Sequence, residues 1–274
     1  GTKDIDPDAL GYWNFLSASY WAIDAAMMAD MAKATGRDAA PYIQMNQRAK
    51  NYIKRSFLKA DGTFKTAILN TMQTPALFAL KVGIVEGKAK EDMIARLRQN
   101  FKEHDNCLQT GFLGTSILMS TLTENGMVDI AYELLFQRKN PSWLYSVDNG
   151  ATTIWERWNS MNPDGSVSST GMNSFNHYAY GAIFQWLAEY AAGLKPATPG
   201  FRRATIAPVP HRHLGSMDYR YDSAAGQYRV RWEAVDDQTL RLWVQVPFGC
   251  EAELKKPYCD EPVQVLTAGS YEFT

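Results

Sequence analysis

Apolar side chains recur every three or four positions over the first two thirds of the chain, which is the spacing of one face of a helix. The pattern predicts helices over residues 14–35, 38–57, 72–84, 88–103, 117–122, 127–137 and 172–193. Asp38 is a candidate cap for the second helix, and Gly36 is a candidate stop for the first. Pro75 suits the first turn of the third helix, where its missing N–H costs nothing.

The predicted helices differ in character from one to the next. Residues 72–84 are apolar and rich in small side chains, whereas residues 88–103 are charged and amphipathic. Such alternation is typical of an α/α toroid, in which inner helices are buried on all sides and outer helices have one wet face. An exact sequence repeat is absent, so an ordinary helical bundle remains an alternative.

After Gly193 the pattern changes to strand-like alternation. Residues 194–203 are rich in Pro and Gly and predict a linker. Apolar side chains then alternate over two strands joined by a turn at Asp236-Asp237, and residues 262–274 predict one more hairpin. The strand faces carry Tyr228, Val230 and Trp232, and then Leu240, Leu242, Val244 and Val246. We therefore expect a helical domain over residues 1–195 and a small antiparallel β-sandwich-like domain over 196–274.

Charge and composition narrow the function classes. The chain has 28 Lys and Arg against 29 Asp and Glu, a balance that gives no basic surface for nucleic acid or an anionic membrane. We expect neither partner. The apolar runs are too short for a transmembrane helix, and residues 1–15 lack the pattern of a signal peptide, so the sequence leaves localisation open. The spacing of His, Cys and carboxylates predicts no metal site, and free thiols are favoured over a Cys250–Cys259 disulfide.

The densest cluster of candidate binding residues lies in residues 141–181. It combines the aromatic residues Trp143, Tyr145, Trp155, Trp158, Phe175, Tyr178 and Tyr180 with the polar residues Asp148, Glu156, Arg157, Asn173, Asn176 and His177. Flat rings cover the C–H patches of a pyranose, and carboxylates and amides bind its hydroxyl groups. The segment therefore indicates a sugar site, with Trp143 and Trp155 among its candidate rings.

Three polar residues in this segment are candidates for specific roles. Glu156 lies between two tryptophans and could act as a general base, with Arg157 keeping it ionised. A Glu156–Arg157 ion pair that braces a loop is the equal alternative. Asn173 and His177 are four residues apart, so on the predicted last helix they would share a face suited to hydroxyl contacts. By itself, His177 is as readily explained as a helix histidine.

Several motifs resemble the α-L-rhamnosidases of glycoside hydrolase family 78. They are MQTPALFAL, TGFLGTSILM, PSWLYSVDNGATTIWERW, MNSFNHYAYG and PGFRRATIAPVP, in that order along nearly the whole chain. The resemblance implies an (α/α)6 toroid followed by a β-sandwich, and inverting removal of terminal α-L-rhamnose from glycosides or polysaccharides. It implies that Glu156 is the general base, that His177 lines the sugar pocket and that Trp143 faces the sugar. No cofactor is implied.

One part of the family pattern has no match here. The family's general acid is a glutamate in an earlier motif near an Asp- and Arg-rich stretch, and only Asp4, Asp6 and Asp8 lie near the start of this chain. About seven helices are predicted, whereas a full toroid has twelve. We therefore expect a partial toroid from the C-terminal part of a larger enzyme, inactive alone.

A partial toroid would affect the surface of the chain and leaves other functions to consider. In a partial toroid, inner helices such as residues 72–84 would be exposed, and the chain would self-associate through that face. The alternative function is a non-catalytic, rhamnose-binding degenerate toroid. Another (α/α)6 hydrolase or lyase is a weaker interpretation, because it would share the toroid without ATTIWERW and MNSFNHYAYG.

Overall fold

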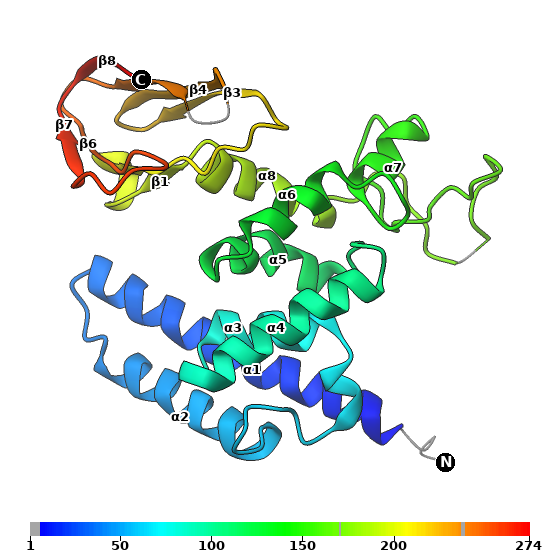
Figure 1. Ribbon diagram of the computed structural model, residues 1–274. Coiled ribbons are helices and arrows are strands. Elements are labelled where there is room, and N and C mark those ends of the chain that lie inside the picture. Colours follow the sequence, from blue (N-terminus) through cyan, green and yellow to red (C-terminus); the bar gives the residue numbers. More distant parts are fainter. Residues whose placement is uncertain (1–5, 170, 237–238) are drawn as a thin grey trace. The chain divides into compact units, whose positions relative to one another are not determined.

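The structure is a computed structural model that describes residues 6–169, 171–236 and 239–274. The chain divides into two units, one ending at Tyr180 and the other running from Gly181 to Thr274. The first unit is built of helices and the second contains strands β1 to β8 (Figure 1). This order confirms the predicted fold class, a mainly helical part followed by a β part.

The first unit is a series of helix pairs. The elements are α1 (Pro7–Ala34), α2 (Ala40–Phe57), η1 (Ala67–Asn70), α3 (Gln73–Val82), α4 (Gly87–Glu103), α5 (Phe112–Glu124), α6 (Val128–Phe136) and α7 (Trp143–Asp148). Helix α1 packs on α2, α3 on α4, and α5 on α6, and α3 also contacts both α1 and α5. Helices α1, α3 and α5 thus form an inner row, and α2, α4 and α6 each pack on one of its members, as the alternating sequence pattern predicts.

Burial follows this division. Most of α3 is buried, from Gln73 to Val82, whereas α4 buries only one stripe, Met93, Leu97 and Phe101. Apolar helices can be enclosed on all sides, and amphipathic helices can cover a core with one face. The carboxylate of Asp38 accepts a hydrogen bond from the N–H of Ala40 at 2.9 Å, but the N-cap of α2 is Ala39, one residue later than predicted, and it has no capping side chain.

The expectation that residues 72–84 are exposed is wrong, because α1, α4 and α5 enclose α3. The exposed apolar face lies on α1 instead. Its members are Leu10, Trp13, Trp21, Met27, Met28 and Met31, and both Trp13 (56%) and Met31 (54%) keep more than half of their surface. Positions 13, 27 and 31 share one side of the helix, opposite the buried Ala22, Ala25 and Ala29. Helix α1 therefore has two apolar faces, of which one is covered.

The predicted single helix over residues 172–193 is wrong. Residues 172–178 have no helical structure, and the helical stretch consists of η2 (Ala179–Ala182), α8 (Ile183–Trp186) and a π-helical turn, η3 (Leu187–Ala191). The cause is hydrogen bonding to the preceding segment. The N–H of Glu156 donates to the carbonyl of Ser174, and the N–H of His177 donates to the carbonyl of Ile154, so that carbonyl of Ser174 and that N–H of His177 are not available for helical i to i+4 bonds.

The second unit contains two four-stranded sheets. One has the order β1 (Leu194–Pro196), β2 (Arg203–Ile206), β6 (Glu251–Leu254), β7 (Gln264–Leu266), and the other has the order β3 (Ser216–Ser223), β4 (Gly226–Ala234), β5 (Leu240–Val246), β8 (Gly269–Phe273). All pairings are antiparallel except β2 with β6. The predicted face of Tyr228, Val230 and Trp232 is fully buried against the other sheet's Ala204, Ile206 and Leu254.

Two predictions for this unit need correction. Residues 194–203 are not simply a linker, because Leu194–Pro196 forms β1 and pairs with β2. The closing segment is not a hairpin, since β7 pairs with β6 in one sheet and β8 with β5 in the other. At the turn between β4 and β5, Asp236 accepts a hydrogen bond from the N–H of Thr239 at 2.7 Å. Asp237, the other predicted turn residue, lies outside the described residues.

The helical end of the second unit is joined tightly to its sheets. The indole N–H of Trp232 donates to the carbonyl of Ala191 at 2.8 Å, and the N–H of Ala207 donates to the carbonyl of Gly193 at 2.9 Å. Gly193 has φ of +80°, and a Cβ there would lie 2.2 Å from the nitrogen of Pro208. Only glycine fits this turn.

None of the helices in the described part of the chain has the length and apolarity needed to cross a bilayer. Cys107, Cys250 and Cys259 are free thiols in the structure.

Candidate active site

An aromatic-lined cavity of about 300 Å³ lies in the first unit, beside α7. Its lining residues are Trp143, Ser146, Val147, Ala151, Thr152, Thr153, Ile154, Trp155, Arg157, Trp158 and Tyr180. Two of the predicted sugar contacts, Trp143 and Trp155, are therefore part of one cavity. Glu156, Asn173 and His177 are not among its lining residues, although both chain neighbours of Glu156 are.

The rings around the cavity are held by their own polar atoms. The indole N–H of Trp143 donates to the carbonyl of Tyr180 at 2.9 Å, and that of Trp158 donates to the carbonyl of Thr110 at 3.0 Å. Trp158 stacks on Tyr180 with ring centroids 3.8 Å apart, and Trp143 meets Trp158 edge-on. With these N–H groups satisfied inside the protein, what the two indoles offer the cavity is apolar ring surface.

Glu156 is half-buried and is held by the segment around Ser174. The N–H of Ser174 donates to Oε2 of Glu156 at 2.8 Å, and the N–H of Glu156 donates to the carbonyl of Ser174, also at 2.8 Å. The other carboxylate oxygen, Oε1, has no hydrogen-bond partner among residues 6–169, 171–236 and 239–274. One oxygen is thus fixed by a backbone donor, and the second can accept a proton or a hydrogen bond from a ligand.

Glu156 and Arg157, the alternative ion pair, form no salt bridge in the described part of the chain. Nε of Arg157 donates to the carbonyl of Met172 at 2.9 Å, and Nη2 donates to the carbonyl of Gly171 at 2.8 Å. The guanidinium of Arg157 therefore braces a loop through backbone carbonyls and makes no ion pair with the carboxylate of Glu156.

His177 and Asn173 lie in the irregular segment before η2, so the predicted shared helix face does not exist. The imidazole of His177 stacks on Phe112 at the start of α5, with ring centroids 4.7 Å apart. Its Nδ1 accepts a hydrogen bond from the N–H of Ala179 at 3.4 Å. In the neutral ring this contact assigns the proton to Nε2, which makes Nε2 a donor.

Asn173 is already engaged by the loop over residues 160–168. Its Nδ2 donates to the carbonyls of Ser160 at 3.1 Å and Ser168 at 3.5 Å. Its Oδ1 is buried and has no hydrogen-bond partner in the described part of the chain. Asn173 thus positions the loop, and its role as a sugar contact stays a prediction.

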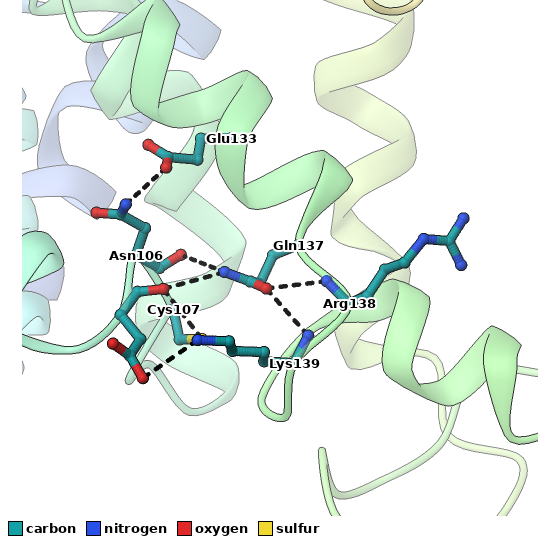
Figure 2. A network of polar contacts seen from close by, with 7 residues as sticks. Asn106, Cys107, Glu133, Gln137, Arg138 and Lys139 are labelled. Carbon is teal, nitrogen blue, oxygen red and sulfur yellow. Dashed lines mark hydrogen bonds and ion pairs between the residues drawn. The ribbon is translucent and has the colours of Figure 1, made fainter.

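A polar network joins the end of α6 to the loop that precedes α5 (Figure 2). The same loop leads to Thr110 and Phe112, which contact Trp158 and His177. Asp105 and Asn106 both have positive φ, near +55°, a left-handed conformation that Asp and Asn adopt more readily than other non-glycine residues. The side-chain amide of Gln137 donates to both of their carbonyls, at 3.1 and 3.2 Å, and its oxygen accepts from the N–H groups of residues 138 and 139. Gln137 therefore ties the end of α6 to this loop.

Burial raises the pKa of Tyr180 to about 12, an effect that the charge of Arg157 reduces and the charge of Glu156 increases. The phenol therefore stays protonated at neutral and moderately alkaline pH. In the described residues, no group of three or more His, Cys, Asp or Glu side chains could hold a metal ion.

Paired helices followed by a small β domain, with an aromatic cavity beside a held carboxylate, define a protein of the helical-hairpin glycosidase class. Residues 8–191 match the bacterial α-L-rhamnosidase 6-hairpin glycosidase domain, and residues 193–268 match the bacterial α-L-rhamnosidase C-terminal domain. The chain belongs to the bacterial α-L-rhamnosidase family, which confirms the resemblance seen in its motifs.

Curated relatives and solved structures agree with this assignment. An α-L-rhamnosidase from Streptomyces avermitilis is 37% identical over 91% of this chain and 24% of its own length, and one from Formosa agariphila is 36% identical over 89% and 26%. The chain thus spans about a quarter of these relatives. A crystal structure of the Streptomyces avermitilis enzyme complexed with L-rhamnose superposes with a TM-score of 0.85 at 32% identity, covering 94% of this chain and 26% of that one. Native α-L-rhamnosidase from Aspergillus terreus gives 0.87 at 30% identity, covering 93% and 29%.

Sequence reasoning missed the groups that hold the predicted residues. Phe112 lies in the motif TGFLGTSILM, whose position before an apolar helix was the only available signal, and the structure stacks it on His177. The donor to Glu156 is a backbone N–H, which leaves no trace in the identity of residue 174.

Proposed function

We propose that this chain carries the general base of an inverting α-L-rhamnosidase, and that Glu156 is that base. The observation that carries the proposal is the state of its carboxylate, in which Oε2 is held by the N–H of Ser174 while Oε1 is without a partner among the described residues. A base needs a fixed orientation and an open oxygen, and this one has both. The substrate class is a glycoside with terminal α-L-rhamnose, as the names of the relatives suggest.

In the proposed reaction, a water molecule donates a hydrogen bond to Oε1 of Glu156. As the water oxygen forms a bond to the anomeric carbon, its proton moves to Oε1 and the bond from that carbon to the leaving oxygen breaks. A carboxylic acid on the opposite face of the sugar must protonate the leaving oxygen. The product is rhamnose with inverted configuration, and no cofactor takes part, because acid, base and water suffice.

The binding surface in this proposal is the cavity with its aromatic faces and the neighbouring histidine. Trp143 and Trp155 would cover C–H patches of the sugar, and Nε2 of His177 would donate to a hydroxyl. Asn173 is retained as a predicted sugar contact.

We further propose that the general acid is not among the first residues of this chain. Asp6 caps α1, since its carboxylate accepts a hydrogen bond from the N–H of Asp8 at 3.0 Å, and Asp8 lies in the first turn of α1. Both carboxylates have ordinary helix-start roles. Asp4 lies outside the described residues. The 274-residue chain alone is therefore expected not to release rhamnose, and activity belongs to a protein that also supplies the acid.

The decisive experiment is Glu156→Gln in the complete gene product. The substitution keeps the shape of the side chain and removes its basicity, so kcat on p-nitrophenyl α-L-rhamnoside should fall by roughly 10²–10⁴-fold. Glu91→Gln is the matched control, because it removes an exposed carboxylate from α4. A kcat within about twofold of the unmodified protein would exclude Glu156 as the base.

Measurements on the complete gene product and its Glu156→Gln variant also distinguish an enzyme from the alternative, a rhamnose-binding module without catalysis. Binding of L-rhamnose by calorimetry with no turnover in the complete gene product would favour the binding module. Turnover that is lost in Glu156→Gln, with L-rhamnose affinity retained, would support the enzyme.

A further inference from the structure

The guanidinium of Arg157 holds two successive backbone carbonyls, and this arrangement has a consequence for its neighbour. Its Nε donates to Met172 and its Nη2 to Gly171, at 2.9 and 2.8 Å. A planar guanidinium presents its N–H groups in a rigid fork, so two bonds fix the position and the orientation of the carbonyls that accept them. Lysine has a single ammonium centre and cannot reproduce this geometry.

The clamped backbone is a strained turn. Met172 has φ of +55°, a left-handed conformation that costs a non-glycine residue energy and persists only when its surroundings determine it. The side chain of Met172 is 81% exposed, so packing of that side chain does not hold the turn. Among the described residues, the bonds from Arg157 to the carbonyls on either side of this φ angle hold the turn, together with the side-chain bonds of Asn173.

The turn leads directly to the group that holds Glu156. Two residues after Met172, the N–H of Ser174 donates to Oε2 of Glu156, and the Ser174 carbonyl accepts from the N–H of Glu156. Asn173, between the two, is anchored through its side chain to the carbonyl of Ser160. The direction of the Ser174 N–H is therefore set by a backbone whose upstream end is fixed by Arg157.

We propose that Arg157 is a positioning residue for Glu156: it clamps the 171–172 turn so that the N–H of Ser174 is aimed at Oε2 and Oε1 is left free for water. The proposal rests on the proposed function of Glu156 as base. The sequence suggested Arg157 as an ion-pair partner of Glu156. In this proposal Arg157 acts on Glu156 indirectly, through the backbone of residues 171–174.

The kinetic test is a double-mutant cycle in the complete gene product. Arg157→Lys and Arg157→Ala should each lower kcat on p-nitrophenyl α-L-rhamnoside, by about 10-fold and about 100-fold, because misaligned catalytic groups lose rate on that scale. KM should stay within about twofold. In the Glu156→Gln background the same changes should lower kcat no further, since Arg157 acts through Glu156. Arg98→Lys is the control, as Arg98 also donates to a carbonyl, that of Gly126.

A second measurement follows the backbone itself and uses the 274-residue chain. Amide hydrogen exchange at Ser174, measured by NMR, should be faster in Arg157→Ala than in the unmodified chain, while the amides of α3 keep their protection. A general loss of amide protection in Arg157→Ala would identify a folding defect. In that case the exchange rate of the Ser174 amide is measured in Arg157→Lys instead.

The outcomes separate the two proposals. If Glu156→Gln retains its kcat, the proposed function fails, and the exchange at Ser174 alone decides whether Arg157 clamps the turn. If Glu156→Gln loses activity but the Arg157 variants change KM instead of kcat, lower kcat equally in both backgrounds, or leave the Ser174 amide protected, the positioning role is overturned. A change confined to KM would instead identify Arg157 as a direct sugar contact.

Discussion

Single residues around the cavity divide their polar and apolar parts between two tasks. Trp143 and Trp158 use their indole N–H groups on backbone carbonyls inside the protein, and the rings remain available to the cavity. A ring fixed in this way loses little side-chain entropy when a ligand binds, which favours stacking on a sugar. His177 follows the same logic, because its Nδ1 accepts from the N–H of Ala179 and its Nε2 is the donor of the neutral ring.

His177→Ala should weaken binding more than chemistry. The variant removes the Nε2 donor and the stack on Phe112, so KM for a rhamnoside should rise by about 10-fold, the effect of one lost hydrogen bond of roughly 1–1.5 kcal/mol. Circular dichroism should show unchanged helix content. His213→Ala, in the second unit, is the control. Unchanged KM, kcat and L-rhamnose affinity would make His177 a structural residue.

Tyr180 predicts a measurable dependence of stability on alkaline pH. Its pKa is about 12 in the folded protein, above the ordinary value near 10, so folding favours the protonated phenol. The stabilisation is complete below pH 10 and is lost as the pH rises from about 10 to 12, where the unfolded chain releases the proton first. Between pH 10 and 12 the melting temperature of Tyr180→Phe should therefore fall by about a few degrees less than that of the unmodified chain. Tyr178→Phe, at an exposed ring, should behave like the unmodified chain.

Elements with a clear amphipathic pattern could be predicted from the sequence, and elements defined by long-range pairing could not. Helices α2 and α4 could be predicted because their buried residues recur at helical spacing. The 172–178 segment has aromatic and polar residues at similar spacing, yet its backbone pairs with residues 154–156, a partner that local periodicity does not reveal. Strands β7 and β8 likewise carry a turn between them, but their sheet partners lie elsewhere in the chain.

The turn at Gly193 offers a test at the scale of elements. Gly193→Ala should destabilise the second unit by more than about 2 kcal/mol, because the added Cβ meets the backbone of Pro208 and the residue has positive φ. Gly200 is a matched control: its φ of +75° is nearly the same as that of Gly193, and a Cβ there meets no atom within 4 Å. Gly200→Ala should cost only about 1 kcal/mol, the strain of the left-handed conformation. Equal costs, measured by urea unfolding, would show that the close approach is unimportant.

At the scale of the whole molecule, the exposed apolar face of α1 is the feature that bears on association of the chain in solution. We propose that the 274-residue chain self-associates through this face, which contains Trp13, Met27 and Met31. Large apolar side chains gathered at the surface of one helix favour contact with a partner. The sequence located such a face on residues 72–84, because it could identify an apolar helix but not which of the apolar helices has neighbours on every side.

Two charges on this face should change the mass measured by light scattering. Met27→Glu combined with Met31→Glu places carboxylates one helical turn apart on the α1 face and should shift the chain towards 30.8 kDa, the mass of a monomer. Val263→Glu with Val265→Glu, at exposed positions of the second unit, should leave the mass unchanged. A monomer before any substitution would contradict the proposal.

The parallel pairing of β2 with β6 has a consequence for synthesis on the ribosome. Strands β1 and β2 end at Ile206, but their sheet is extended only by β6 and β7, and the other sheet is completed by β8, which ends at Phe273. Neither sheet can close before β7 and β8 have been translated and have left the exit tunnel. The helix pairs of the first unit are made of local contacts and can fold much earlier. A nascent chain stalled near residue 250 would therefore present folded helices and open strand edges, the form that chaperones and proteases recognise.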